Sequence, residues 1–70
     1  MTAYQPEDIN RQTVLCKDGQ PSFQIVCPTL QEAVIEVKNR WSKDDQGKAR
    51  FRVVGKKYQY TWADIKPHVD

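Results

Sequence analysis

Apolar side chains follow two different periods along the chain, and these periods predict its elements. In residues 12–27 and again in 49–62, apolar and polar positions alternate, which is typical of strands with one buried face. In residues 30–42 the apolar positions recur every three to four residues, as in an amphipathic helix. A polar arm, 1–11, precedes these elements and a short tail, 63–70, follows them. The pattern predicts one small domain with the element order β-β-α-β-β.

Turn chemistry divides the first alternating stretch into a hairpin. Residues 18–21 are Asp-Gly-Gln-Pro, in which glycine accepts a positive φ and proline cannot donate a hydrogen bond to a neighbouring strand. A four-residue loop would pair Lys17 with Ser22 and so set the register of both strands. That register predicts a buried face made of Val14, Cys16, Phe23, Ile25 and Cys27. It leaves Leu15 and Val26 on the opposite face.

The helix has the clearest start signal in the chain. Thr29 with Glu32 three residues later is a capping box, in which the threonine hydroxyl accepts from a backbone N–H and the glutamate reaches back. One apolar stripe follows at helical spacing: Leu30, Ala33, Val34, Val37 and Trp41. We expect a helix over residues 30–42 with this stripe buried, and then a solvated loop over residues 42–48.

The second hairpin separates apolar from basic side chains. Gly55 and Lys56 form a two-residue loop with glycine first, the pattern of a type II′ turn. Counting outward from this turn pairs Val54 with Lys57 and Arg52 with Gln59. The register predicts an apolar face of Ala49, Phe51, Val53, Tyr58, Tyr60 and Trp62. The opposite face carries Arg50, Arg52, Val54, Lys57, Gln59 and Thr61.

Two hairpins with one apolar face each and one amphipathic helix predict an α+β fold. We expect a four-stranded antiparallel sheet with the helix packed on one face and the basic face left open. The large aromatic residues are expected to dominate the core: Trp41, Phe51, Tyr60 and Trp62. The arm is expected to be irregular with one helical turn at residues 6–9. Pro67 is expected to limit residues 63–67 to a terminal turn.

Charge is segregated along the chain, although its totals are nearly balanced. Eleven Lys and Arg residues against nine Asp and Glu give a formal net charge of +2 over 70 residues. Residues 49–62 hold four cations and no acid, a local charge of +4, so the rest of the chain sums to −2. The second hairpin therefore supplies the candidate contact residues Arg50, Arg52, Lys56, Lys57 and Gln59.

The sequence argues against catalysis, metal binding and membrane insertion. The single histidine, His68, lies near the C-terminus and the three glycines are isolated in turns, so neither a positioned base nor a phosphate loop is expected. Cys16 and Cys27 are too few and too widely spaced for a zinc knuckle. We expect two reduced core thiols, with a disulfide in an exported protein or a reactive thiol as the alternatives. The longest apolar run is three residues, far short of the roughly 20 of a membrane helix.

Two function hypotheses from different classes follow from the basic hairpin. A non-enzymatic regulatory protein, without cofactor, would bind a protein partner through the open face, where Arg50 and Arg52 lie near exposed aliphatic side chains. The alternative is a nucleic-acid-binding domain, in which the hairpin enters a groove or Tyr58 and its aromatic neighbours stack on bases. We rank the protein partner slightly ahead, because a net charge of +2 is low for a dedicated nucleic-acid domain.

Size and layout refine the protein hypothesis. Small accessory proteins, including those of phages and mobile elements, share this single-domain layout, although a shared layout does not fix function. The N-terminal residues have neither the basic start nor the apolar centre of a secretory signal, so we expect a cytoplasmic protein with no membrane partner. The open face also leaves a monomer or a weak homodimer as the expected states.

Overall fold

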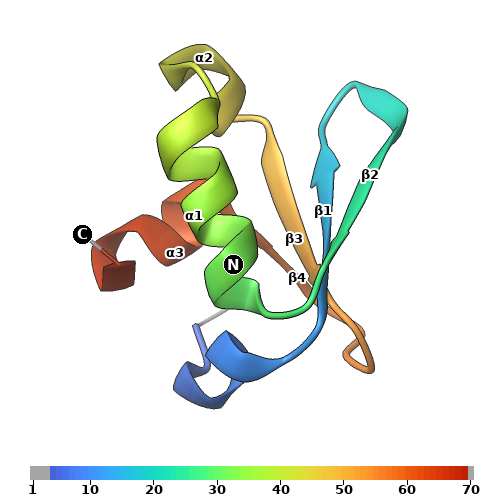
Figure 1. Cartoon of the computed structure of the whole chain (residues 1–70), viewed down its shortest axis with the longest axis vertical. Helices are drawn as coiled ribbons and strands as arrows, with labels where there is room; N and C mark the ends of the chain where they lie inside the picture. The colour runs from blue at the N-terminus through green and yellow to red at the C-terminus, as the bar shows by residue number, and fades with distance from the viewer. Residues whose placement is uncertain (1–3, 70) are drawn as a thin grey trace.

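The computed structural model describes residues 4–69 and contains one four-stranded antiparallel sheet in the order β2-β1-β3-β4. The elements, in chain order, are η1 (Pro6–Asn10), β1 (Thr13–Lys17), β2 (Gln20–Cys27), α1 (Leu30–Arg40), α2 (Lys43–Gln46), β3 (Ala49–Val53), β4 (Gln59–Thr61) and α3 (Trp62–Val69). The helices lie on one side of the sheet (Figure 1). The predicted α+β fold, with the amphipathic helix on one face, is confirmed. The parts of the predicted arm and tail at residues 1–3 and 70 lie outside the described residues.

The predicted register between β1 and β2 is wrong by one residue. Gly19 has a φ of +83° and permits a two-residue turn, so Lys17 pairs with Gln20 instead of Ser22. A bulge after Cys16 then shifts the ladder, and Leu15 faces Ile25. Pro21 does not end β2, because β2 is an edge strand and one of its sides needs no N–H donors.

The one-residue shift exchanges the two faces of β1. Leu15 and Thr13 are fully buried under the helices, whereas the predicted core residues Val14 and Cys16 are half-buried on the opposite face. Cys27 is buried as predicted. Both cysteines are free thiols, but only one of them belongs to the core.

The helix α1 starts where the capping box predicts and ends two residues early. The Thr29 hydroxyl accepts a hydrogen bond of 3.1 Å from the Glu32 backbone N–H. Trp41 leaves the helix with extended backbone angles, and its ring meets Phe23 edge-on with centroids 5.4 Å apart. Trp41 is therefore half-buried at the margin of the core and does not dominate it.

A short helix, α2, replaces the loop expected at residues 42–48. The Ser42 hydroxyl accepts from the Asp45 backbone N–H at 3.2 Å, so the segment has a helix cap of its own. The Gln46 side chain donates to the carbonyls of Val37 and Trp41, at 3.3 and 3.4 Å. The Val37 carbonyl also accepts from the Trp41 N–H at 3.2 Å, so Gln46 adds a second hydrogen bond there and ties α2 to the end of α1.

The predicted register of β3 and β4 is confirmed, but the turn between them differs. Arg52 faces Gln59, and the ladder continues to the pair of Arg50 and Thr61. The Lys56 N–H donates to the carbonyl of Val53, which puts Gly55, with φ +88°, third in the turn rather than second. Strand β4 is consequently only three residues long, and the outermost predicted pairs do not form.

The chain ends in a helix rather than the predicted turn. Thr61 and Asp64 cap α3 reciprocally, since each side chain accepts a hydrogen bond from the other residue's backbone N–H, at 3.0 and 3.3 Å. Pro67 lies inside α3 and removes one backbone donor. Burial of Trp62 and Ile65 against the core offsets that loss.

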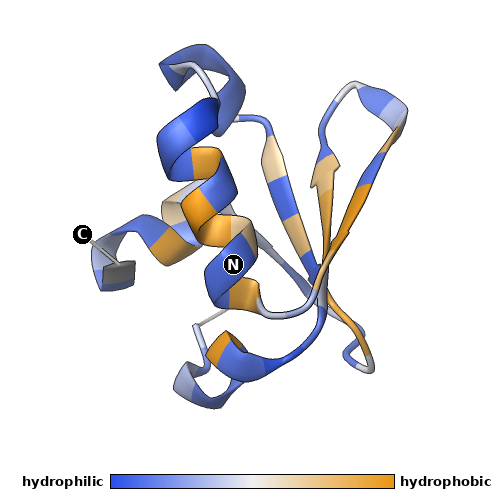
Figure 2. Cartoon of the chain, viewed as in Figure 1, coloured by the Kyte–Doolittle hydropathy of each residue, from blue (hydrophilic) through white to orange (hydrophobic). Residues whose placement is uncertain are grey.

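The core lies between the sheet and the two longer helices, and the apolar side of α1 faces the sheet (Figure 2). Phe51 and Tyr60 are fully buried, and Phe51 stacks on Trp62 with ring centroids 6.2 Å apart. Three of the four aromatic residues predicted for the core are therefore confirmed there. In the described part of the chain, no helix has the length and apolar character needed to cross a bilayer.

Candidate functional site

The face of the sheet opposite the helices is uncovered by any element that the structure describes (Figure 1). Residues paired across antiparallel strands point to the same face, so the register defines the rows of side chains on it. One row, from β2 to β4, is Val26, Val14, Arg52 and Gln59. The next row is Gln24, Cys16, Arg50 and Thr61. We call these eight residues the open face.

Arg52 is the cation most available for binding on the open face. Its side chain is exposed, and within residues 4–69 no hydrogen bond or ion pair involves its guanidinium. Val14 and Gln59 flank it on the neighbouring strands. A guanidinium next to an aliphatic side chain can pair with a carboxylate while its stem contacts apolar surface.

Arg50 is held by its own protein. Its guanidinium lies 3.4 Å from the Asp18 carboxylate and donates to the carbonyls of Ala49 at 2.9 Å and Gly47 at 3.4 Å. Its side chain is only 25% exposed. Arg50 therefore contributes positive potential to the open face but is partly neutralised and fixed in position.

The two lysines of the turn do not belong to the open face. Lys56 is half-buried and lies close enough to Asp8 to lower the pKa of that carboxyl group. Lys57 is exposed in the segment between β3 and β4. Of the five residues that the sequence singles out, the structure brings together Arg50, Arg52 and Gln59, and places the lysines at the end of the hairpin.

A shallow hollow of about 280 Å³ lies where the open face meets the turn between β1 and β2. Its lining includes Cys16, Asp18, Pro21, Arg50, Arg52 and Gln59. Two guanidinium groups and the Lys17 ammonium group against one carboxylate make the lining of this hollow net positive. It can accept an acidic side chain near Arg52.

The open face also has an aliphatic half, which the sequence predicted only in part. Val26 is 62% exposed and lies next to Val14, two strands from Arg52. Leu15, expected on this face, is fully buried instead, because of the shifted register. The open face is therefore aliphatic at Val14 and Val26, polar at Gln24, and cationic along β3.

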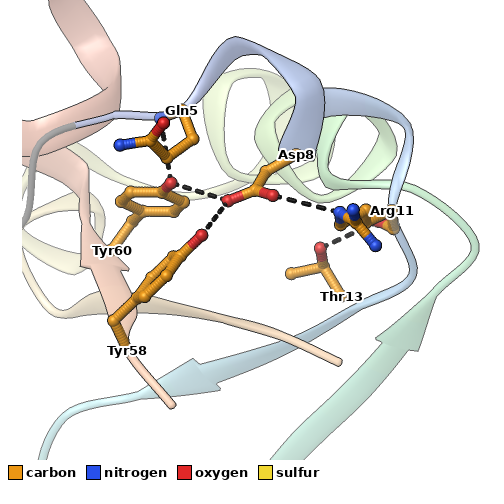
Figure 3. A network of polar contacts seen from close by, with 6 residues as sticks. All are labelled: Gln5, Asp8, Arg11, Thr13, Tyr58 and Tyr60. Atoms are coloured by element: carbon orange, nitrogen blue, oxygen red, sulfur yellow. Dashed lines mark hydrogen bonds and ion pairs between the residues drawn. The ribbon is translucent and has the colours of Figure 1, made fainter. Parts of the chain in front are cut away.

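A buried carboxylate that the sequence did not indicate lies beside the turn end of the second hairpin, where it meets Tyr58 and Tyr60 (Figure 3). Asp8 of η1 is fully buried, and one of its carboxylate oxygens accepts from the hydroxyls of Tyr58 at 2.6 Å and Tyr60 at 2.8 Å. Its other oxygen lies 3.2 Å from Nε of Arg11, as an ion pair without hydrogen-bond geometry. The Tyr60 hydroxyl in turn accepts from the Gln5 backbone N–H at 3.0 Å. We call Asp8, Tyr58 and Tyr60 the arm clasp.

The electrostatics of the arm clasp favour a charged aspartate and neutral tyrosines. Burial raises the pKa of Asp8, but the hydrogen bonds from Tyr58 and Tyr60, with the charges of Lys56 and Arg11, outweigh it and lower that pKa overall. Burial and the Asp8 carboxylate raise the pKa of Tyr60. Neither tyrosine is activated as a base or nucleophile, so the arm clasp is a structural fastening of η1 to the sheet.

Neither a metal centre nor a family relationship guides the functional assignment. Within the described residues, no three His, Cys, Asp or Glu side chains form a group that could hold a metal ion. No protein-family model, no curated protein and no solved structure matches the chain. Its function is therefore inferred from its own residues.

Proposed function

We propose that this is a non-enzymatic binding protein whose open face contacts an acidic patch on a partner protein. The observation that carries the proposal is the exposed guanidinium of Arg52, which lies between Val14 and Gln59 on an uncovered sheet face. No residue among 4–69 forms a hydrogen bond or ion pair with it. Arg is enriched at the centres of protein interfaces, where it combines a planar donor group with an apolar stem.

Charge and shape favour an acidic protein over a nucleic acid. The positive charge on the open face comes from two arginines, one of them paired with Asp18. Nucleic-acid domains neutralise several phosphates with many more cations. Val26 and Val14 provide an aliphatic area beside the arginines that a phosphate backbone would not use. A partner with a carboxylate next to an apolar side chain matches both halves of the face.

The aromatic side chains of the second hairpin are poorly placed to stack on nucleic-acid bases. Tyr60 is fully buried and Trp62 is 8% exposed. The Tyr58 hydroxyl is bonded to Asp8. The nucleic-acid hypothesis therefore depends on Arg52 and the two turn lysines as phosphate contacts.

The test is affinity capture from a cell extract with three versions of the immobilised chain, each with and without nuclease. These are the wild type, Arg52→Glu, and Lys43→Glu, which makes the same charge change at an exposed site on α2. We expect the wild type and Lys43→Glu to capture a partner protein that stays bound after nuclease treatment. Arg52→Glu should not capture it. We use Arg52 alone, because replacing Arg50 would also break its bonds to Asp18 and Ala49.

Oligonucleotide titration separates the two classes of partner. Labelled duplex and single-stranded oligonucleotides are titrated with the wild-type chain at 50 and 200 mM salt. A nucleic-acid-binding domain that contacts several phosphates would bind at 50 mM and lose affinity steeply by 200 mM. Binding of that kind, with no nuclease-resistant protein captured, would overturn the proposal in favour of the alternative.

We also propose that the protein acts in the cytoplasm. Its two cysteines are free, which is the state that a reducing compartment maintains. Fractionation of cells that express a tagged chain would test this, and recovery outside the cytoplasm would contradict it.

A further inference from the structure

The two edges of the sheet differ in length and in protection. Strand β4 is three residues long, runs directly into α3 and follows a turn that carries Lys56 and Lys57. Strand β2 is eight residues long and contains no charged residue. Short strands and lysines are the usual means by which proteins keep a sheet edge from pairing with another chain. The β2 edge carries no lysine, and its only protection is Pro21 and the bulge at its turn end. Residues 24–27 of β2 remain a regular strand edge without either device.

The exposed side chains of β2 add apolar surface at this edge. Val26 on the open face is 62% exposed, and Ile25 on the helix side is 38% exposed. A strand added alongside β2 would cover part of both side chains and supply partners for the backbone groups that face away from β1. An added strand would therefore bury apolar surface on both faces of the sheet at this edge.

We propose that the added strand is β2 of a second copy of this chain, paired antiparallel about a two-fold axis to form a continuous eight-stranded sheet. Because β2 carries no charge, the paired strands place no like charges opposite each other, whatever their register. A charged partner segment would find no counter-charge on this strand. This pairing uses the backbone edge of β2, and it shares with the contact proposed for Arg52 only the β2 side chains of Gln24 and Val26.

The positive charge of each copy does not oppose the pairing. In the order β2-β1-β3-β4, Arg50 and Arg52 lie on the second strand in from the edge. Five strand spacings of about 4.8 Å separate the two β3 strands of the pair, or about 24 Å. The screening length at physiological salt is about 8 Å, so repulsion between the two sets of arginines is small.

The pairing should be weak and concentration-dependent. One added strand buries less than the roughly 1,200 Å² of standard stable interfaces. We therefore expect half of the chains to be paired at a total concentration on the order of 100 µM. One strand pair with two aliphatic contacts supplies only a small free energy of association. At lower concentrations the chain is a monomer of 8.2 kDa.

Sedimentation equilibrium between about 10 µM and 1 mM tests the proposal on the full chain. The mass of the wild type should rise from 8.2 kDa toward twice that value. Val26→Lys places a charge on the edge and should stay monomeric at every concentration. Val54→Lys makes the same change at an exposed valine, 46% accessible, in the turn after β3 and away from the edge, and should associate like the wild type.

Amide hydrogen exchange gives a second readout that does not depend on a variant folding. Alternate amides of β2 that face away from β1 should exchange more slowly at 1 mM than at 10 µM, while those of β4 should not change. A wild-type chain that stays monomeric to 1 mM would overturn the proposal. Association that survives in Val26→Lys, or that is lost equally in Val54→Lys, would also overturn it, because the contact would then lie elsewhere.

Discussion

Asp8→Asn tests the arm clasp by removing one charge and almost no volume. The carboxylate of Asp8 is fully buried and accepts two hydrogen bonds, of 2.6 and 2.8 Å, from tyrosine hydroxyls. Hydrogen bonds to a charged group contribute about 1.5–3 kcal/mol each. Asparagine keeps one acceptor oxygen, but its amide group then faces the Arg11 donor. We expect the free energy of unfolding at pH 7 to fall by about 2–4 kcal/mol, and Tm to fall on the order of 10–20 °C.

The dependence of this loss on pH identifies its cause. Hydrogen bonds and nearby cations lower the pKa of Asp8 in the folded protein, whereas burial alone would raise it. A carboxyl group with a lowered folded-state pKa stabilises the fold above its unfolded pKa, about 3.9, and this contribution is lost as the pH falls through the folded value. The difference in free energy of unfolding between wild type and Asp8→Asn should therefore be largest at pH 7 and should become smaller below about pH 4.

Urea denaturation of both proteins at pH 7 and at pH 2.5 measures both effects, and Glu7→Gln is the matched control. Glu7 is the exposed neighbour of Asp8 on η1, so its neutralisation should change the free energy of unfolding by less than about 0.5 kcal/mol. Asp8→Asn with wild-type stability at pH 7 would refute the reasoning. A loss equally large at both pH values would also refute it, because it would then come from packing and not from charge.

Three further predictions concern the core, the helix cap and the thiols. Phe51→Ala empties a fully buried site and should lower the free energy of unfolding by about 3–5 kcal/mol, measured by urea denaturation. Thr29→Ala removes the cap of α1 and should lower it by about 1 kcal/mol in the same assay, with Thr29→Ser close to wild type. Cys16 should react with iodoacetamide well before Cys27, because Cys27 is buried and burial raises its pKa; mass spectrometry of the modified peptides would show the order, and the reverse order would contradict the assigned faces of β1.

The second hairpin and the helix start were predictable because one local pattern decides each of them. A shift of one residue between β3 and β4 would have exchanged Phe51 with Arg52, so only one register separates apolar from basic side chains. The Thr29 cap is likewise a matter of four consecutive residues. These features needed no knowledge of the rest of the chain.

The first hairpin was less predictable because β1 has apolar residues on both of its faces. Val14 and Leu15 are adjacent, so either register buries an aliphatic side chain, and the hydrophobic pattern does not choose between them. The turn sets the register between β1 and β2, through the positive φ of Gly19 and the bulge after Cys16. The predicted register, wrong by one residue, placed Leu15 on the open face and left Val14 out of the candidate contact surface.

Features that join distant parts of the chain could not be predicted from local patterns. Asp8 lies 50 residues from Tyr58 in sequence, and nothing near it in the chain indicates a buried carboxylate. The helix at the C-terminus was not predicted, because Pro67 argues for a turn and the reciprocal cap of Thr61 and Asp64 is evident only in the fold. In the fold, Trp62 and Ile65 have a core to pack against.

The central claim is that a partner contacts the open face around Arg52. NMR mapping of the complex tests it most directly, with the captured partner added to the ¹⁵N-labelled chain and the amide shifts followed residue by residue. The largest shifts should fall on Val14, Arg52 and Gln59, on three neighbouring strands. Shifts gathered instead around the groove of about 310 Å³ between η1 and α1, where Ile9 and Ile35 lie, would contradict the claim.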